Sequence, residues 1–218
     1  VLKNQALLQS LLPSPNQLVI PYQTHGTQIL LLDEKSMCAS PVEREACLQE
    51  VDALITNLPG YCLCISTADC VPVLLYDKAH QAIAAIHAGW RGTAARIVES
   101  VLQRMFAVFG TQGEDVVACI GPSISLNAFE TGEEVYRIFA EKGFPMTNIA
   151  RRSLKTGKWH LDLWEANRLQ LLQFGVPERQ IEVSGICTYT QSEDFFSARK
   201  LGIHSGRILS GIMIKETV

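Results

Sequence analysis

Residues 66–93, STADCVPVLLYDKAHQAIAAIHAGWRGT, decide how this sequence folds, because they are predicted to form a β-hairpin. Two apolar runs flank the short polar segment DKAH (77–80), the pattern of two antiparallel strands joined by a tight loop. If the first and last residues of that loop face each other, the register places Cys70 opposite His87 at the open end. Opposed side chains project from one face with Cβ atoms about 4.5–5.5 Å apart. The hairpin therefore predicts a thiol and an imidazole close enough to share a metal ion or a proton.

The residues that follow His87 predict an anion site. The segment AGWRGT (88–93) leads into residues 94–109, whose apolar side chains recur every four positions as on one face of a helix, and Gly110 ends it. Unpaired N–H groups at a helix N-terminus attract anions, and Arg91 adds a forked donor. A thiol, an imidazole and a phosphate site are therefore expected within one supersecondary unit.

Composition limits the class of protein. A chain of 218 residues with 47% hydrophobic content can bury a substantial core, which predicts one domain over residues 1–218. The first predicted helix begins almost at residue 1, so an element upstream is expected. A net charge of −3 argues against nucleic-acid binding. No apolar run is long enough to cross a membrane and the start lacks a signal-peptide pattern, which predicts a cytoplasmic protein whose oligomeric state stays open.

The predicted elements favour an α+β fold. Strands occur in pairs and runs instead of alternating strictly with helices, which is typical of mixed or antiparallel sheets. About nine strands and four helices fit two packed sheets flanked by helices. Besides the hairpin, strands are expected at 18–22, 27–32, 52–56, 61–66, 115–120, 181–186 and 207–214, and helices at 2–12, 94–109, 132–142 and 161–174. Residues 33–49 are expected to form a loop or a short helix on the surface, and residues 143–158 a loop.

Three residues form a candidate metal site. His25 lies in a break between two predicted strands, and together with Cys70 and His87 it completes a Cys/His₂ set. Such a set with an open fourth position is a known catalytic zinc arrangement, and it can also hold copper. Cys62 and Cys64 are expected on opposite faces of a strand, so they are not taken as a ligand pair.

The other polar candidates weigh less. Asp69 adjoins Cys70 and is either a partner of the metal site, a general base or a turn-forming residue. His80, His160 and His204 lie in predicted turns or loop edges, where a solvated surface position is the expected role.

The sequence resembles one known family along nearly its whole length. The resemblance rests on motifs that occur in order, of which TADCVP and HAGWRG are the most specific. They are QTHG (23–26), DALIT (52–56), TADCVP (67–72), HAGWRG (87–92), GPSI (121–124), CT (187–188) and FSAR (196–199). This pattern is similar to the YfiH family, long labelled multicopper polyphenol oxidase or laccase-like.

The resemblance implies a fold, a metal and an activity. It implies a single α+β domain with layered mixed sheets, and zinc or copper held at His25, Cys70 and His87. It further implies phosphorolysis of adenosine, inosine and methylthioadenosine to base and sugar 1-phosphate, with an accompanying adenosine deaminase activity. Bacterial relatives are also linked to peptidoglycan editing. The chain departs from the family pattern at Gln5, where an arginine is common, and at Ala128-Phe129-Glu130, where a Cys-Tyr-Glu run is common.

Under this hypothesis the metal polarises a substrate oxygen or a water, while Asp69 steers or accepts the proton. Arg91 and the helix after it would hold phosphate, with Ser197 and Arg199 closing the pocket. The H-x-E and P-C-x-x-C signature of zinc deaminases is absent from the sequence, so deamination would need a different scaffold.

Three other functions stay open. Cys70 as a thiolate nucleophile with His87 as its base would make an amide hydrolase, for example one acting on a peptidoglycan precursor. A zinc ion that only stabilises the fold would make a binding protein. A copper-dependent polyphenol oxidase of the laccase type needs on the order of ten histidines, often as His-x-His pairs. The sequence has five histidines and no such pair, although one Cys/His₂ copper could support slow oxidation.

Overall fold

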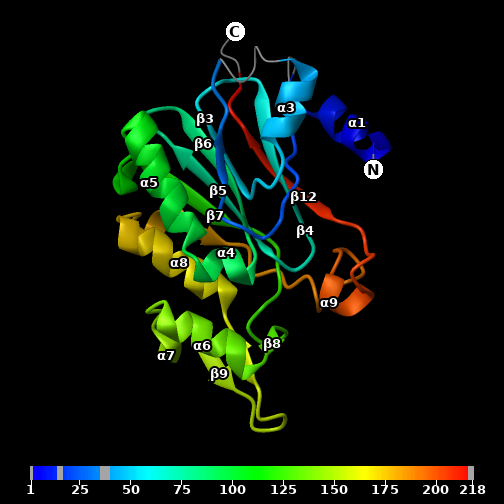
Figure 1. The fold of residues 1–218 in the computed structure, drawn as a ribbon, viewed down its shortest axis with the longest axis vertical. Helices are drawn as coiled ribbons and strands as arrows, with labels where there is room; N and C mark the ends of the chain where they lie inside the picture. The colour runs from blue at the N-terminus through cyan, green and yellow to red at the C-terminus, as the bar shows by residue number, and fades with distance from the viewer. Residues whose placement is uncertain (1, 14–16, 35–39, 216–218) are drawn as a thin grey trace.

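The computed structural model describes residues 2–13, 17–34 and 40–215, and it places them in layers (Figure 1). The central layer is a mixed six-stranded sheet in the order β11-β7-β5-β6-β3-β2. Strand β5 pairs antiparallel with β6 and β7, while the outer pairs β2–β3 and β11–β7 are parallel. Its strands are β2 (Ile29–Leu31), β3 (Ala53–Thr56), β5 (Val71–Asp77), β6 (Ala82–Ala88), β7 (Val116–Ile120) and β11 (Ile181–Val183).

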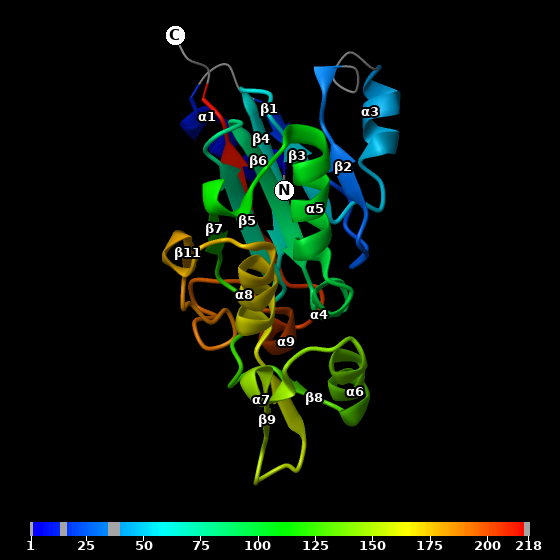
Figure 2. The ribbon, with the colours of Figure 1, turned by 90° about the vertical axis from the view of Figure 1, so that its left-hand side faces the viewer.

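Different layers cover the two faces of this sheet. Helices α5 (Ile97–Phe109) and α8 (Leu163–Phe174) lie on one face (Figures 1 and 2). A three-stranded sheet in the order β1-β4-β12 packs on the other face. Its strands are β1 (Gln17–Val19), β4 (Tyr61–Thr67) and β12 (Ile208–Met213).

The core follows from the two-residue period of the strands. In β6, Ala84 and Ile86 belong to the apolar cluster under the helices. Ile83 and Ala85 belong to the cluster between the two sheets. His87 has the same parity as these last two residues, so its side chain points into the space between the sheets, at the end of β6.

A small lobe holds a third sheet, at the lower end of Figure 1. It consists of β8 (Glu130–Thr131), β9 (Ala150–Arg152) and β10 (Trp159–Leu161), with α6 (Glu133–Glu141) and α7 (Met146–Ile149) beside it. The other helices are α1 (Leu2–Leu11), α3 (Pro41–Cys47), α4 (Trp90–Ala94) and α9 (Ala198–Leu201), with 3₁₀ turns η1 (Gly113–Asp115) and η2 (Glu178–Gln180). None of the described helices is long and apolar enough to cross a membrane.

The structure confirms the α+β fold class and corrects its detail. Two sheets were expected, but the lobe adds a third, because residues 143–158 contain α7 and β9 where a loop was predicted. The predicted helix 94–109 is confirmed as α5, except that α5 begins three residues later, at Ile97. Arg96 adopts a left-handed backbone with φ 61°, which separates α4 from α5. Gly110 ends α5 in a left-handed conformation, as predicted.

The predicted hairpin register is wrong by two residues. Val71 pairs with Ala88 and Asp77 with Ala82, so the loop comprises residues 78–81. The reason is that Asp77 stays in the strand, where its carboxylate accepts the backbone N–H of Ala79 at 2.9 Å. The side chain thus closes the loop from within β5, and the strand extends one residue further than its apolar run.

The expectation for Cys62 and Cys64 is also wrong. Residues two apart on a strand share a face, and the two sulfur atoms lie 3.6 Å apart. Gly211 of β12 makes room for them, because a Cβ there would lie 3.0 Å from Sγ of Cys64. Both thiols are free and buried.

Candidate metal centre

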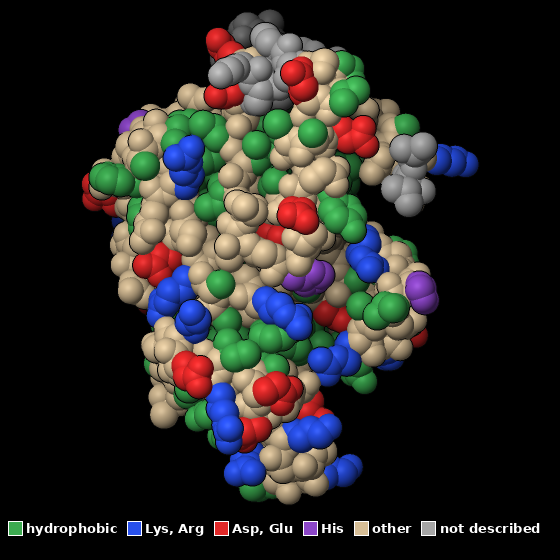
Figure 3. All heavy atoms as spheres, in the orientation of Figure 1, with side chains coloured by type: hydrophobic (Ala, Val, Ile, Leu, Met, Phe, Trp, Pro, Cys, Tyr) green, Lys and Arg blue, Asp and Glu red, His purple; other side chains and the backbone are tan. Residues whose placement is uncertain are grey.

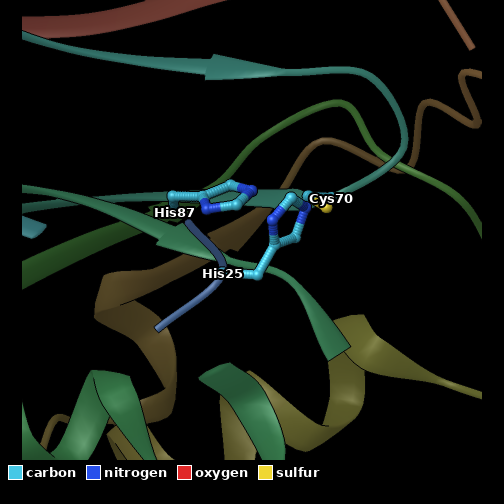
Figure 4. A group of neighbouring side chains, drawn as sticks. All are labelled: His25, Cys70 and His87. Atoms are coloured by element: carbon cyan, nitrogen blue, oxygen red, sulfur yellow. The ribbon is translucent and has the colours of Figure 1, made fainter. Parts of the chain in front are cut away.

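Three separate turns and strands bring His25, Cys70 and His87 together (Figure 4). His25 comes from the turn between β1 and β2, Cys70 from the turn before β5, and His87 from β6. One ligand atom from each residue lies within 4.8 Å of the other two. The two imidazole rings meet edge to face, with centroids 4.8 Å apart. The structure therefore assembles the Cys/His₂ set that the sequence predicted.

Gly89 explains how the thiol reaches the imidazoles despite the shifted register. Val71 pairs with Ala88, so extending this register by one residue places Cys70 opposite Gly89. His87 is then the diagonal neighbour of Cys70 on the same face of the sheet. A Cβ on Gly89 would lie 3.2 Å from Sγ of Cys70 and 3.1 Å from Cδ2 of His25. The missing side chain leaves the space in which the three ligand atoms converge.

Asp52 holds the cluster in place from behind. Its carboxylate is fully buried and contacts Nδ1 of His87 at 2.6 Å. The same carboxylate accepts the backbone N–H groups of Thr24, His25 and Gly26 at 3.3, 3.0 and 2.7 Å. A carboxylate on Nδ1 fixes the orientation of the ring and leaves Nε2 for a ligand, as in many metal sites. One residue thus orients both histidines.

The cluster is strongly polarised. Burial of the Cys70 thiol opposes its ionisation, but hydrogen bonds with His25 and His87 outweigh burial and lower its pKa to about 6. Burial favours neutral His87, yet its hydrogen bonds with Asp52 and Cys70 raise its pKa to about 9. Burial also opposes ionisation of Asp52, and the hydrogen bond with His87 and those from the turn lower its pKa. These contacts favour the ionised thiol of Cys70 and the protonated ring of His87.

The residues present fit a transition-metal ion. One thiolate sulfur and two imidazole nitrogens are donors that both zinc and copper accept. Three protein ligands leave a coordination position for a substrate or water, and the Asp52–His87 pair supplies the outer support typical of such sites. Within the described residues this is the one group of three or more His, Cys, Asp or Glu with that geometry.

The cluster opens into a cavity of about 550 Å³. All three candidate ligands line it, so a small molecule in the cavity would reach them. The lining residues are Pro21, Tyr22, Gln23, His25, Ser66, Thr67, Ala68, Cys70, His87, Ala198, Ile203 and Arg207.

The remaining predicted site residues lie beside this cavity rather than in its lining. Both carboxylate oxygens of Asp69 are engaged, one by the hydroxyl of Thr188 and one by the backbone N–H of Arg199, each at 2.7 Å. Ser197 caps α9 through a hydrogen bond from the backbone N–H of Lys200. These contacts tie the turn that carries Cys70 to α9.

The two predicted phosphate-binding arginines have other partners. The guanidinium of Arg91 lies 4.3 Å from the ring centroid of Trp90. Nη1 of Arg199 donates to the carbonyl oxygen of Glu130 at 2.9 Å, and its guanidinium lies 5.5 Å from the ring centroid of Phe129. Helix α4, which follows Gly89, has five residues, so the long helix whose N-terminus was expected to attract phosphate does not begin there.

Sequence reasoning missed four residues of the site. The sequence does indicate a special position for Asp52, because an acidic residue at the start of the apolar run DALIT needs hydrogen-bond partners when it is buried. Gly89 and Thr67 lie within the motifs HAGWRG and TADCVP, but the sequence does not indicate their contacts or those of Arg207, because these depend on strand register and on side chains that meet only in the folded chain.

The fold and the site define the class of protein: a layered α+β protein with a Cys/His₂ candidate metal centre on a cavity. A family model described as multi-copper polyphenol oxidoreductase laccase matches residues 1–215. A protein of Bacteroides thetaiotaomicron named purine nucleoside phosphorylase is 63% identical over 99% of this chain and 80% of its own length. A protein of an unknown prokaryotic organism, named adenosine deaminase RL5, is 42% identical over 92% of this chain and 76% of its own length.

Solved structures agree with these sequence matches. The crystal structure of Bacillus licheniformis hypothetical protein YfiH superposes with a TM-score of 0.88 at 31% identity, covering 99% of this chain and 81% of that one. The chain therefore belongs to the YfiH family of enzymes, which the sequence motifs predicted.

Proposed function

We propose that this protein is a metal-dependent purine nucleoside enzyme. It uses phosphate to split adenosine, inosine or methylthioadenosine into a free base and a sugar 1-phosphate, and it also deaminates adenosine. The observation that carries the proposal is the Cys/His₂ cluster on a cavity of about 550 Å³. It is supported by relatives named purine nucleoside phosphorylase and adenosine deaminase.

His25, Cys70 and His87 would hold the metal ion, with Zn²⁺ as the expected occupant and Cu²⁺ as the alternative. A bound ion of this kind supplies Lewis acidity toward a water or substrate oxygen. The protein's own part is to keep the ligands aligned: Asp52 fixes His87 and the turn of His25, and Gly89 keeps the space between them clear.

Phosphorolysis exchanges one bond for another. A phosphate oxygen forms a bond to the sugar C1′ while the C1′–N bond breaks, and the base leaves with the bonding pair and takes up a proton. In deamination water replaces the amino group and ammonia leaves. The proton that the base takes up is the one that hydrogen phosphate releases when it forms the sugar ester. The sequence predicted Asp69 as proton carrier, but both its carboxylate oxygens are hydrogen-bonded, to Thr188 and to the backbone of Arg199, so its proposed role is to position α9 beside the cavity.

The test is product analysis with adenosine and metal-loaded protein. With phosphate present, adenine and ribose 1-phosphate are expected, and without it inosine and ammonia. Cys70→Ala should abolish both product sets. Cys119→Ala is the matched control, because Cys119 lies exposed on β7. Full turnover by Cys70→Ala would refute the proposal.

A second function is favoured by one observation. Cys70, His87 and Asp52 form a thiol–imidazole–carboxylate series, the arrangement of a cysteine hydrolase. That enzyme would cleave an amide, as in a peptidoglycan precursor, without metal. Amide hydrolysis that iodoacetamide blocks and a chelator leaves unchanged would identify it.

A further inference from the structure

We propose that Thr67 and Arg207 form an oxyanion subsite in the cavity, and that this subsite takes inorganic phosphate. The inference rests on the proposed function and deepens it by assigning the phosphate a place. Both side chains line the same cavity as Cys70, His25 and His87.

Thr67 offers a buried hydroxyl without a partner. Its residue is 1% exposed, and its Oγ1 makes no hydrogen bond to any described group. A buried polar group left unsatisfied costs free energy, so native structures pair nearly all of them. Thr67 is one of the residues that line the cavity, so a molecule bound there is the partner assigned to this hydroxyl.

Arg207 offers a fixed cation with free donors. Its Nη1 donates to the carbonyl oxygens of Ser205 and Gly206 at 2.6 and 3.0 Å. Its Nη2 donates to the carbonyl oxygen of Ile203 at 3.2 Å. A guanidinium has five N–H donors, so donors remain for a bound anion beyond these three bonds. No carboxylate of the described chain pairs with Arg207.

The two residues lie next to each other in the fold. Thr67 ends β4 and pairs with Ile208, the first residue of β12, so Arg207 lies one residue beyond that pair. A guanidinium and a hydroxyl are both hydrogen-bond donors, which is what an oxyanion requires of a binding site. Arg207 is the one Arg or Lys among the residues that line the cavity, whereas Arg91 and Arg199 contact other groups.

The surface around the subsite carries charges of both signs. Figure 3 shows Lys and Arg side chains over the small lobe and around α9, interspersed with Asp and Glu. Exposed basic residues of the lobe and α9 include Arg151, Arg152, Lys155, Lys158, Arg199 and Lys200, and Lys158 is paired with Glu130. The attraction for an anion is therefore assigned to Arg207 itself.

Calorimetric titration with inorganic phosphate tests the subsite directly. Metal-loaded wild-type protein should bind phosphate, and Arg207→Gln should bind it at least about tenfold more weakly because a charged donor is lost. Arg207→Lys should recover part of the affinity. Arg179→Gln is the matched control, since it removes one exposed positive charge of η2 at a residue that does not line the cavity and should leave binding unchanged.

Thr67 is tested by two variants of opposite design. Thr67→Val keeps the shape and removes the hydroxyl, so phosphate affinity should fall by about threefold to tenfold. Thr67→Ser keeps the hydroxyl and should bind phosphate as the wild type does. Equal affinity in Thr67→Val and wild type, or no phosphate binding by the wild type, would overturn the subsite.

Kinetics separate this inference from the proposed function. In phosphorolysis, Arg207→Gln should raise KM for phosphate at least about tenfold, while KM for adenosine changes little. Phosphorolysis by Arg207→Gln with the wild-type KM for phosphate refutes the subsite and leaves the function standing. Phosphate binding that depends on Arg207, in a protein without phosphorolysis, upholds the subsite and refutes the function.

Discussion

An aspartate–histidine pair lies at each end of the β5–β6 hairpin, with the aspartate of the open end supplied by the residue before β3. At the open end, buried Asp52 contacts Nδ1 of His87 at 2.6 Å. At the closed end, buried Asp77 contacts Nδ1 of His80 at 2.8 Å. Each carboxylate also accepts backbone N–H groups from a turn, three for Asp52 and two for Asp77.

The two pairs differ in what the other ring nitrogen meets. His87 is 3% exposed and adjoins Cys70, His25 and the cavity. His80 is 38% exposed, and its Nε2 faces Gly110. The comparison teaches that a carboxylate–histidine pair is a device for fixing an imidazole. It becomes a functional site where further ligands converge on the free nitrogen.

Removal of each imidazole gives the largest contrast. His87→Ala should lose the metal and lower turnover on the order of a thousandfold or more, because a ligand is gone. His80→Ala should keep metal content and turnover and lose about 1–3 kcal/mol of stability, because buried Asp77 is left short of a partner. Elemental analysis, nucleoside turnover and urea unfolding measure the three quantities. Equal turnover in both variants would abolish the distinction between the two ends.

Removal of each carboxylate charge sharpens the comparison. Asp52→Asn should weaken metal affinity by about 10–100-fold, since the partner that orients His87 is lost. Asp77→Asn should lower stability and leave metal affinity unchanged. Competition with a coloured chelator gives the affinities, and an unaltered affinity in Asp52→Asn would show that the carboxylate does not support the metal.

Alanine substitutions of two glycines, one at each end of the hairpin, are expected to have smaller effects than the changes above. Gly89 has φ −64°, so alanine fits its backbone, but the new Cβ would press on Cys70 and His25. Gly89→Ala should therefore weaken metal affinity several-fold with little loss of stability. Gly110 has φ +84°, so Gly110→Ala should cost about 1 kcal/mol of stability at unchanged affinity. Chelator competition and urea unfolding on both variants check this, and reversed outcomes would contradict it.

The smallest expected effect is on the pH dependence of stability. Burial opposes ionisation of Asp77, but hydrogen bonds, including those from His80, outweigh burial and lower its pKa. A carboxyl with a depressed folded pKa stabilises the protein above its unfolded pKa of about 3.9, and this contribution is lost as pH falls through the folded pKa. The unfolding free energy that separates wild type from Asp77→Asn should thus be largest near pH 6 and shrink below about pH 4. Urea unfolding across this range measures it, and a constant difference would contradict the assignment.

Much of this fold follows from local pattern. Strand alternation and glycine punctuation predicted the hairpin, the end of α5 at Gly110 and the α+β class. Local pattern failed where a single side chain or backbone angle decides the outcome. The carboxylate of Asp77 moved the register by two residues, and the left-handed backbone of Arg96 moved the start of the predicted helix from residue 94 to Ile97.

The candidate site was likewise predicted only in part. Cys70 and His87 were predicted as neighbours through direct opposition, whereas they meet on the diagonal across Gly89. The roles of Asp52, Thr67 and Arg207 require knowledge of which turn folds over which strand, and no residue spacing in the sequence records that.

The carboxylate of Asp52 hydrogen-bonds both the ring of His87 and the backbone N–H groups of residues 24–26. Ligand binding at the cluster and the stability of that turn are therefore thermodynamically linked. A ligand that favours one geometry of His87 stabilises the turn, and a change that destabilises the turn weakens the binding of that ligand by the same free energy. Hydrogen exchange at three backbone amides is therefore a gauge of ligation that needs no substrate.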